Sequence, residues 1–234
     1  MIYVMSDIHG MYDKYQEMLD KIGLTDSDTL FVIGDVLDRG PQPVEILFDM
    51  MMRPNVIPII GNHEYMAANC LDLLEDDLTP DVIEELEEER WISLFEWMSN
   101  NADPTIRELQ ALDEEEREQV VDYLGEFSAY EEVTVGDRSY LLVHAGLGNF
   151  RPDKPLDAYD LFDLVWDRPD WDRRYFDDPN RYVIVGHTPT QTIQDDQPPK
   201  IFYRNQFIDI DCGACFPGGR LACLRLDDMQ EFYT

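Results

Sequence analysis

Short runs of β-branched and aromatic residues alternate with helical patterns in the first part of the chain. Such runs are typical of buried strands, and they cover residues 2–5, 29–33 and 56–60. Apolar residues recur at helical spacing over 15–22, followed by Gly23 in a C-cap position, and a second helical pattern covers 41–51. A third helix is expected near Glu64. Pro58 predicts an edge strand or a bulge, because proline has no N–H to donate to a neighbouring strand. Alternation of this kind indicates an α/β fold with crossover helices.

Residues 72–132 differ in character and predict a separate helical insert. They hold 22 acidic residues against 3 basic ones. Thr79-Pro80-Asp81 is typical of a helix start, and Asp113 with Glu116 resembles a capping box. We interpret the acidic runs as solvated faces, with a docking surface for basic partners as the alternative. The helical spacing of four apolar residues predicts packing between the insert and the sheet; they are Trp91, Leu94, Phe95 and Met98.

The remainder of the chain is rich in strand patterns. Residues 131–135 and 139–143 flank Gly136-Asp137 and predict a hairpin. Further strands are expected in a second sheet, at 182–185, 201–203, 206–210 and 221–226.

Charge and cysteine content exclude several classes of partner and site. The formal net charge of −32 over 234 residues disfavours nucleic acid and anionic membranes. No apolar run is long enough for a membrane span, and we expect a cytoplasmic protein in which the four cysteines are reduced. Cys212 and Cys215 form a C-x-x-C pair, which we interpret as packing, with redox or metal chemistry as the alternative. The oligomeric state is not readable from the sequence.

Polar loops follow five of the predicted strands, and they contain all four histidines of the chain. In open α/β sheets, ligands bind at the carboxyl ends of the strands, so these loops should converge on one site. The spacing of Asp7 and His9 would place both side chains on the same side of an extended backbone. Glycines in the same loops permit the close backbone approach that a metal centre needs. The loops read Ser6-Asp7-Ile8-His9-Gly10, Gly34-Asp35-Val36-Leu37-Asp38-Arg39-Gly40, Gly61-Asn62-His63-Glu64, His144-Ala145-Gly146 and Gly186-His187-Thr188-Pro189.

This ordered set of motifs resembles the calcineurin-like metallophosphoesterases, and most of all the short bacterial and phage members of the phosphoprotein phosphatase branch. The resemblance implies a four-layer αββα sandwich in a single domain over residues 1–234, with the helical insert at about 72–132. It also implies two divalent metal ions. Asp7, His9 and Asp35 would bind the first ion, and Asp35, Asn62, His144 and His187 the second. These ligand types suit Mn²⁺ above all, with Fe or Zn²⁺ as alternatives.

The resemblance assigns the remaining polar residues to the reaction. His63 would be the general acid that protonates the leaving oxygen, oriented by Asp38. Arg39 would bind phosphate oxygens through its planar guanidinium group. Arg168 would be a second phosphate-binding arginine, with an ordinary surface arginine as the alternative.

The sequence therefore predicts a metal-dependent phosphomonoesterase, with a serine/threonine protein phosphatase as the main interpretation. Its substrate would be a phosphoprotein or a small phosphoester. The alternative is a hydrolase of diadenosine tetraphosphate and other dinucleoside polyphosphates. Asp38 and Glu64 argue against that alternative, because members of the dinucleotide branch generally carry other residues at these two positions. A non-catalytic protein-interaction scaffold is a minor alternative, since such scaffolds typically lose ligands that this chain retains.

Overall fold

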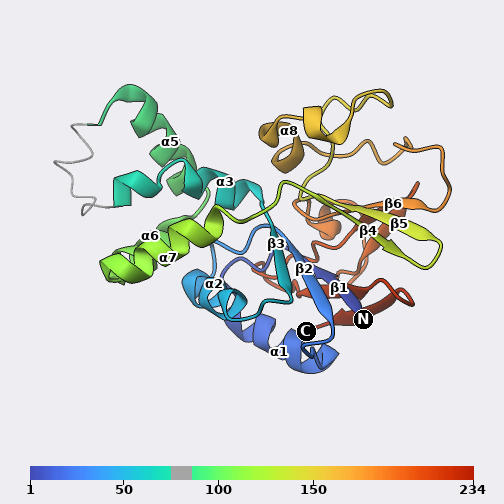
Figure 1. The fold of residues 1–234 in the computed structure, drawn as a ribbon, viewed down its shortest axis with the longest axis horizontal. Helices are drawn as coiled ribbons and strands as arrows, with labels where there is room; N and C mark the ends of the chain where they lie inside the picture. The colour runs from blue at the N-terminus through green and yellow to red at the C-terminus, as the bar shows by residue number, and fades with distance from the viewer. Residues whose placement is uncertain (75–85) are drawn as a thin grey trace.

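Two mixed sheets packed face to face form the centre of the molecule. In the computed structural model, which describes residues 1–74 and 86–234, each sheet has five strands (Figure 1). In the first sheet β1 (Ile2–Met5), β2 (Thr29–Ile33) and β3 (Val56–Ile59) are parallel. The last two strands of the chain, β9 (Ala222–Arg225) and β10 (Gln230–Tyr233), complete it in the order β10-β9-β1-β2-β3.

The placement of β9 corrects the sequence-based prediction for residues 221–226. These residues were expected in the second sheet, but β9 pairs antiparallel with β1 and sets Leu224 opposite Val4. The chain thus returns to cover the edge of β1, which would otherwise be left open beside the inter-sheet core. At the opposite edge, β3 carries Pro58 as predicted, and the proline carbonyl accepts a hydrogen bond from Ser128 N at 3.2 Å.

The second sheet begins with the predicted hairpin. Strands β4 (Glu131–Val135) and β5 (Arg138–Leu142) are antiparallel and join at the Gly136-Asp137 turn. The parallel strands β6 (Arg181–Val185) and β8 (Phe207–Asp209) follow, and β7 (Phe202–Arg204) forms the far edge. Its order is β4-β5-β6-β8-β7.

Both faces of each sheet are buried, because alternate side chains of a strand point to opposite faces. Val4 and Phe31 of the first sheet pack with Tyr140 and Ile184 of the second in the core between the sheets. Their sequence neighbours point the other way: Met5, Leu30 and Val32 pack against helices α1 (Tyr12–Ile22) and α2 (Pro43–Met51), whereas Leu141 and Val183 pack under the short helix α8 (Leu161–Val165) and its flanking loops. Because neighbouring side chains in a strand point to opposite faces, buried strands of this kind are apolar throughout.

Helices begin and end where local signals predict. Helix α1 ends at Gly23, which adopts a left-handed conformation with φ of 61°. Helix α3 (Asn62–Ala68) starts two residues before the predicted position. Short 3-10 turns cover Leu71–Leu74, Leu156–Ala158 and Thr190–Thr192. Within the described ranges, no helix has both the length and the apolar character needed to cross a membrane.

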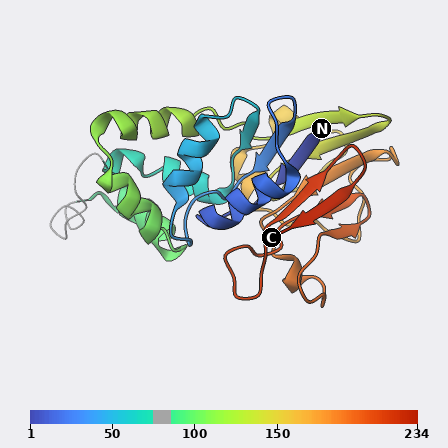
Figure 2. The same cartoon turned by 90° about the horizontal axis from the view of Figure 1, so that it is seen from below.

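Three helices of the insert project from one side of the sandwich. Figures 1 and 2 show α5 (Glu88–Ser99), α6 (Asp103–Ala111) and α7 (Glu114–Leu124) at the same end of the molecule. They pack against α2 and α3. The capping box of α7 is confirmed, because Glu116 N donates to Asp113 Oδ1 and Asp113 N donates to Glu116 Oε2. The helix start predicted at Thr79-Pro80-Asp81 lies outside the described residues.

The predicted core stripe of α5 is wrong in three of its four positions. Leu94 is buried, but Trp91, Phe95 and Met98 are 44%, 57% and 42% exposed. The fully buried aromatic is instead Trp97, three residues after Leu94. Side chains three residues apart, such as Leu94 and Trp97, and four residues apart, such as Leu94 and Met98, both lie on one helix face. Spacing alone therefore does not determine which of these residues is buried. The packing of α5 against another helix, rather than against the sheet, makes that selection.

Candidate metal centre and active site

The five predicted loops meet at the carboxyl ends of β1, β2, β3, β5 and β6. Their polar side chains are almost completely withdrawn from solvent, and His187 is partly buried at the edge of the group. The fully buried members are Asp7, His9, Asp35, Asp38, Asn62, His63 and His144. Buried ionisable groups are costly unless they are paired or coordinate a metal, so this concentration marks a functional site.

The backbone at the site is left-handed at several residues other than glycine. The prediction that Asp7 and His9 lie on extended backbone is therefore wrong: their φ angles are 51° and 47°. Such conformations are unfavourable for side chains with a Cβ and persist where surrounding contacts enforce them, typically at functional sites. The six predicted site residues with positive φ are Asp7, His9, Asp35, Asp38, Arg39 and His187.

Two glycines allow the loops to approach the acidic ligands. A Cβ on Gly61 would lie 2.3 Å from Asp35 Oδ1, and a Cβ on Gly186 would lie 2.1 Å from Asp7 Oδ2. Both distances are far below van der Waals contact, so only glycine fits at these positions.

In one half of the site, nitrogen and oxygen atoms of neighbouring side chains lie around His144. The His144 Nδ1–H group donates to the Ile33 carbonyl at 2.9 Å, which directs Nε2 at the centre, where its lone pair binds a metal once the proton is lost. Nε2 lies 3.0 Å from Asn62 Oδ1 and 3.3 Å from Asp35 Oδ1. His187 Nδ1 also lies 2.8 Å from Asn62 Oδ1. Several electron-rich atoms facing one point repel each other unless a cation lies between them, so the donor set fits a metal ion.

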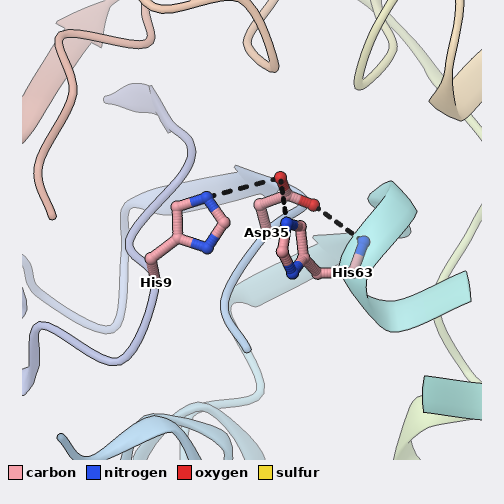
Figure 3. A group of neighbouring side chains, drawn as sticks. All are labelled: His9, Asp35 and His63. Carbon is pink, nitrogen blue, oxygen red and sulfur yellow. Dashed lines mark hydrogen bonds and ion pairs between the residues drawn. The ribbon is translucent and has the colours of Figure 1, made fainter. Parts of the chain in front are cut away.

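The other half of the site centres on the second oxygen of Asp35. His9 donates through Nδ1 to the Leu37 carbonyl at 2.9 Å and presents Nε2 to Asp35 Oδ2 at 3.5 Å. Figure 3 shows the rings of His9 and His63 both directed at Asp35 Oδ2, while the His63 backbone N–H donates to Oδ1. Asp35 thus belongs to both ligand clusters, one with His9 and His63 and the other with His144 and His187.

Asp7 belongs to neither of those two clusters in the described part of the chain. Its two carboxylate oxygens accept the backbone N–H of His187, at 3.1 and 3.0 Å. The structure therefore brings Asp7 to the centre, but its contact there is with the loop that carries His187. Its role as a ligand of the first ion stays a prediction.

Burial and charged neighbours shift the pKa values of the ionisable groups at the centre. Burial raises the pKa of Asp7 to about 7. Burial opposes a charge on His144, but the Asp35 and Asp7 carboxylates outweigh it and raise the pKa of that ring to about 10. Burial and the neighbouring His144 lower the pKa of His187 to about 3. A bound divalent ion would take the place of the proton that His144 otherwise holds.

His63 and Asp38 form the expected pair. His63 Nδ1 lies 2.6 Å from Asp38 Oδ2, and both side chains are fully buried. Two residues that the sequence analysis did not assign to the site complete the surroundings of Asp38. Trp97 Nε1 donates to Oδ2 at 2.9 Å, and the Thr105 hydroxyl donates to Oδ1 at 2.6 Å. Both come from the insert, and no motif in the sequence links them to Asp38.

Glu64 holds the loop that carries Asp35 and Asp38. Its Oε2 accepts the backbone N–H groups of Gly61 and Asp35, at 2.9 and 2.8 Å. Its Oε1 accepts those of Val36 and Leu37, at 2.8 and 3.0 Å. Four backbone donors on one buried carboxylate fix the turn after β2. Glu64 was identified only as part of a motif, and its contacts define this supporting role.

The two predicted phosphate-binding arginines differ in position. Arg39 lies half-buried at the centre, with Nη1 2.8 Å from His9 Nε2 and Nη2 3.0 Å from His63 Nε2. Arg168 is exposed beyond α8, and its charge helps to lower the pKa of His187. Of the C-x-x-C pair, Cys212 is buried, whereas Cys215 is half-buried beside the Arg39 guanidinium; both are free thiols.

Comparisons with known proteins agree with this architecture. Over 97% of its length the chain is 26% identical to an asymmetrical bis(5'-nucleosyl)-tetraphosphatase of Halalkalibacterium halodurans, of which it covers 90%. It is also 26% identical to a protein of the same name from a Geobacillus strain, with 98% and 91% coverage.

Two solved structures share the fold. A protein provisionally named a diadenosine tetraphosphatase superposes with a TM-score of 0.66 at 15% identity, over 100% of this chain and 92% of that one. A serine/threonine phosphatase of Saccharomyces cerevisiae superposes with a TM-score of 0.54 at 13% identity, over 100% and 78%. A sequence profile described as calcineurin-like phosphoesterase matches residues 1–210. The chain therefore belongs to the calcineurin-like phosphoesterase family.

Proposed function

We propose that this phosphoesterase hydrolyses dinucleoside polyphosphates. The observation that carries the proposal is the similarity to two bis(5'-nucleosyl)-tetraphosphatases, which extends over 97% and 98% of this chain. This preference reverses the order of the two sequence-based interpretations, in which protein phosphatase came first.

The proposed metal centre uses the ligands implied by the family resemblance. Asp35 would bridge two divalent ions, with Asp7 and His9 on one side and Asn62, His144 and His187 on the other. When bound, two such ions supply an activated water and neutralise phosphate charge. The ligands are carboxylate, amide and imidazole groups, which suit Mn²⁺, Fe or Zn²⁺ alike.

Arg39 and His63 would act together on the phosphate. In the structure the Arg39 guanidinium donates to ring nitrogens of His9 and His63. A phosphate group offers stronger, charged acceptors to the same two donors, so its arrival would free Nε2 of His63 to carry a proton. Asp38 would keep that proton donor in place through Nδ1, at 2.6 Å. Arg168, at the rim, would meet the outer part of a polyphosphate.

A serine/threonine protein phosphatase is the second candidate, and the Asp38–His63 pair favours it. A serine alkoxide is a poor leaving group that needs a proton, whereas a nucleotide phosphate leaves without one. A firmly held proton donor therefore adds more to monoester hydrolysis than to phosphoanhydride hydrolysis.

A direct comparison of substrates tests the proposal. Purified protein with Mn²⁺ is given diadenosine tetraphosphate and, in parallel, a phosphoserine peptide, with Asp35→Asn and a metal-only blank as controls. We expect nucleotide products from the dinucleotide, a higher kcat/KM for it than for the peptide, and no turnover by Asp35→Asn. Faster hydrolysis of the peptide would establish the second candidate. If wild type and Asp35→Asn hydrolysed the dinucleotide at the same rate, the proposed metal centre would not take part in the reaction.

A further inference from the structure

A cavity of about 380 Å³ lies beside the metal centre, among helices α3, α5 and α8. Its volume is within the range of small-molecule sites. The residues that matter here are Tyr65, Asn69, Ser93, Glu96, Phe162 and Trp166. We propose that this cavity is a nucleoside subsite, which receives one base of the substrate while the phosphates lie at the metal centre. The assignment rests on the proposed function and gives that function a location.

The cavity adjoins the metal centre through Trp166. The Trp166 ring lies 6.0 Å from the His187 ring, centroid to centroid, and is nearly perpendicular to it. Tyr65, which also lines the cavity, belongs to α3, the helix that carries His63. In Figure 1, α3 lies between α5 and α8. A nucleotide whose phosphate is at the metal centre would thus extend past Trp166 into the cavity.

The aromatic wall suits a flat base. Phe162 is 57% exposed, and its ring is 6.2 Å from that of Trp166 and tilted to it by 34°. A large aromatic side chain left in water next to a polar site offers a stacking surface, and every nucleobase has a face that stacks. Asn69, Ser93 and Glu96 also line the cavity, and their amide, hydroxyl and carboxylate groups are of the kinds that hydrogen-bond the polar edge of a base.

The cavity and the metal centre differ in charge, and this difference favours the base in the cavity and the phosphate at the metal centre. Two carboxylates, Glu89 and Glu96, and one guanidinium group, Arg90, line the cavity, so negative charge predominates there and disfavours phosphate. Arg39 lies at the metal centre and attracts it. The neutral base is therefore the part that the cavity favours, and the anionic part is directed toward the catalytic groups.

Calorimetric titration of two probes tests the subsite without relying on turnover. Adenosine 5'-monophosphate and ribose 5-phosphate carry the same phosphate and sugar, and they differ only in the base. Each is titrated into the Mn²⁺-loaded protein, into Phe162→Ala and into a matched control, Phe95→Ala. Phe95 has the same 57% exposure and lies on α5, but it does not line the cavity.

We expect wild type and Phe95→Ala to bind the nucleotide about tenfold more tightly than the sugar phosphate, as stacking of one base predicts. In Phe162→Ala this ratio should fall toward one, because the stacking face is lost, with the sugar phosphate unaffected. Equal affinities for both probes in wild type would overturn the subsite, and so would equal losses in both variants. Hydrolysis of diadenosine tetraphosphate is measured separately: its absence with the base preference intact would refute the proposed function and leave the subsite standing.

Discussion

Thr105→Val is the perturbation that most directly tests whether the insert positions the proposed proton donor. Valine has nearly the shape of threonine, so the change removes one hydroxyl from a fully buried position. That hydroxyl donates to Asp38 Oδ1 at 2.6 Å and accepts from Asp38 N at 2.9 Å. The variant leaves Trp97 and His63 on Oδ2, so Asp38 stays in the site but is held less firmly, because both of its contacts with Thr105 are lost.

The expected size of the effect follows from the hydrogen bond that Asp38 Oδ1 would no longer accept. A hydrogen bond to a charged group contributes about 1.5–3 kcal/mol, and about 1.4 kcal/mol corresponds to a tenfold change in rate. Since the other carboxylate oxygen keeps both of its partners, we expect the lower end of this range. Thr105→Val should therefore lower kcat by roughly tenfold for a substrate whose leaving group needs a proton.

The assay compares two aryl phosphates with the Mn²⁺-loaded enzyme. Phenyl phosphate has a poor leaving group, phenolate, and its hydrolysis should show the full loss of kcat. The 4-nitrophenolate group of 4-nitrophenyl phosphate leaves without a proton, so hydrolysis of that substrate should show little loss. Ile106→Val, in the same helix and also buried, is the matched control. It costs about 0.5–1.5 kcal/mol of stability without touching Asp38, and it should leave the ratio of the two kcat values unchanged.

An equal fall for both aryl phosphates in Thr105→Val would refute the reasoning. It would show that the variant disturbs the metal centre as a whole rather than the proton donor. An unchanged kcat for phenyl phosphate would show that Asp38 does not need the insert.

Three further predictions concern the metal ions, the loop after β2 and the surface of the insert. Dialysis against a chelator should abolish activity and lower Tm, with both restored by Mn²⁺, because a ligand that binds only the folded state stabilises it; an unchanged Tm in a thermal scan would contradict the metal centre. Glu64→Gln should lower the free energy of unfolding in urea by about 3 kcal/mol, since an amide nitrogen replaces an oxygen that accepts two buried backbone N–H groups; wild-type stability would refute this account of the loop. Burial, together with the nearby Glu45, raises the pKa of Glu108 to about 7 from 4.5. The folded state therefore holds this proton more tightly than the unfolded chain, and stability falls as pH rises between these values. Glu108→Gln should raise Tm near pH 8 but not near pH 5, and a shift of equal size at both pH values would exclude this titration.

Many features of the fold were predictable from local patterns. The runs at 2–5, 29–33 and 131–135 coincide with β1, β2 and β4. The Pro58 edge strand and the Gly23 cap also form as expected. These features depend on the preferences of a few adjacent residues, such as a missing N–H or a left-handed turn, which are the same in any fold. In contrast, β10 and α8 were not predicted, because they are short and carry no clear periodicity.

The choice of partner for each surface needed the folded chain. Strand β9 is recognisable as a strand, but only packing decides that it joins β1. Helix α5 is recognisable as amphipathic, but its contact with another helix buries Trp97 and leaves Phe95 in solvent. Such outcomes depend on shapes that residues distant in sequence present to one another.

The sequence by itself determined which side chains gather at the centre, because each of them directly follows a strand and parallel strands bring their carboxyl ends to one edge. Asp35, His63 and His144 needed no more than that rule to be found together. Only the tertiary structure decided what holds them in place: the contacts of Trp97 and Thr105 with Asp38 join segments about 60 residues apart, and no local preference specifies a hydrogen bond between side chains that meet only after the insert has packed.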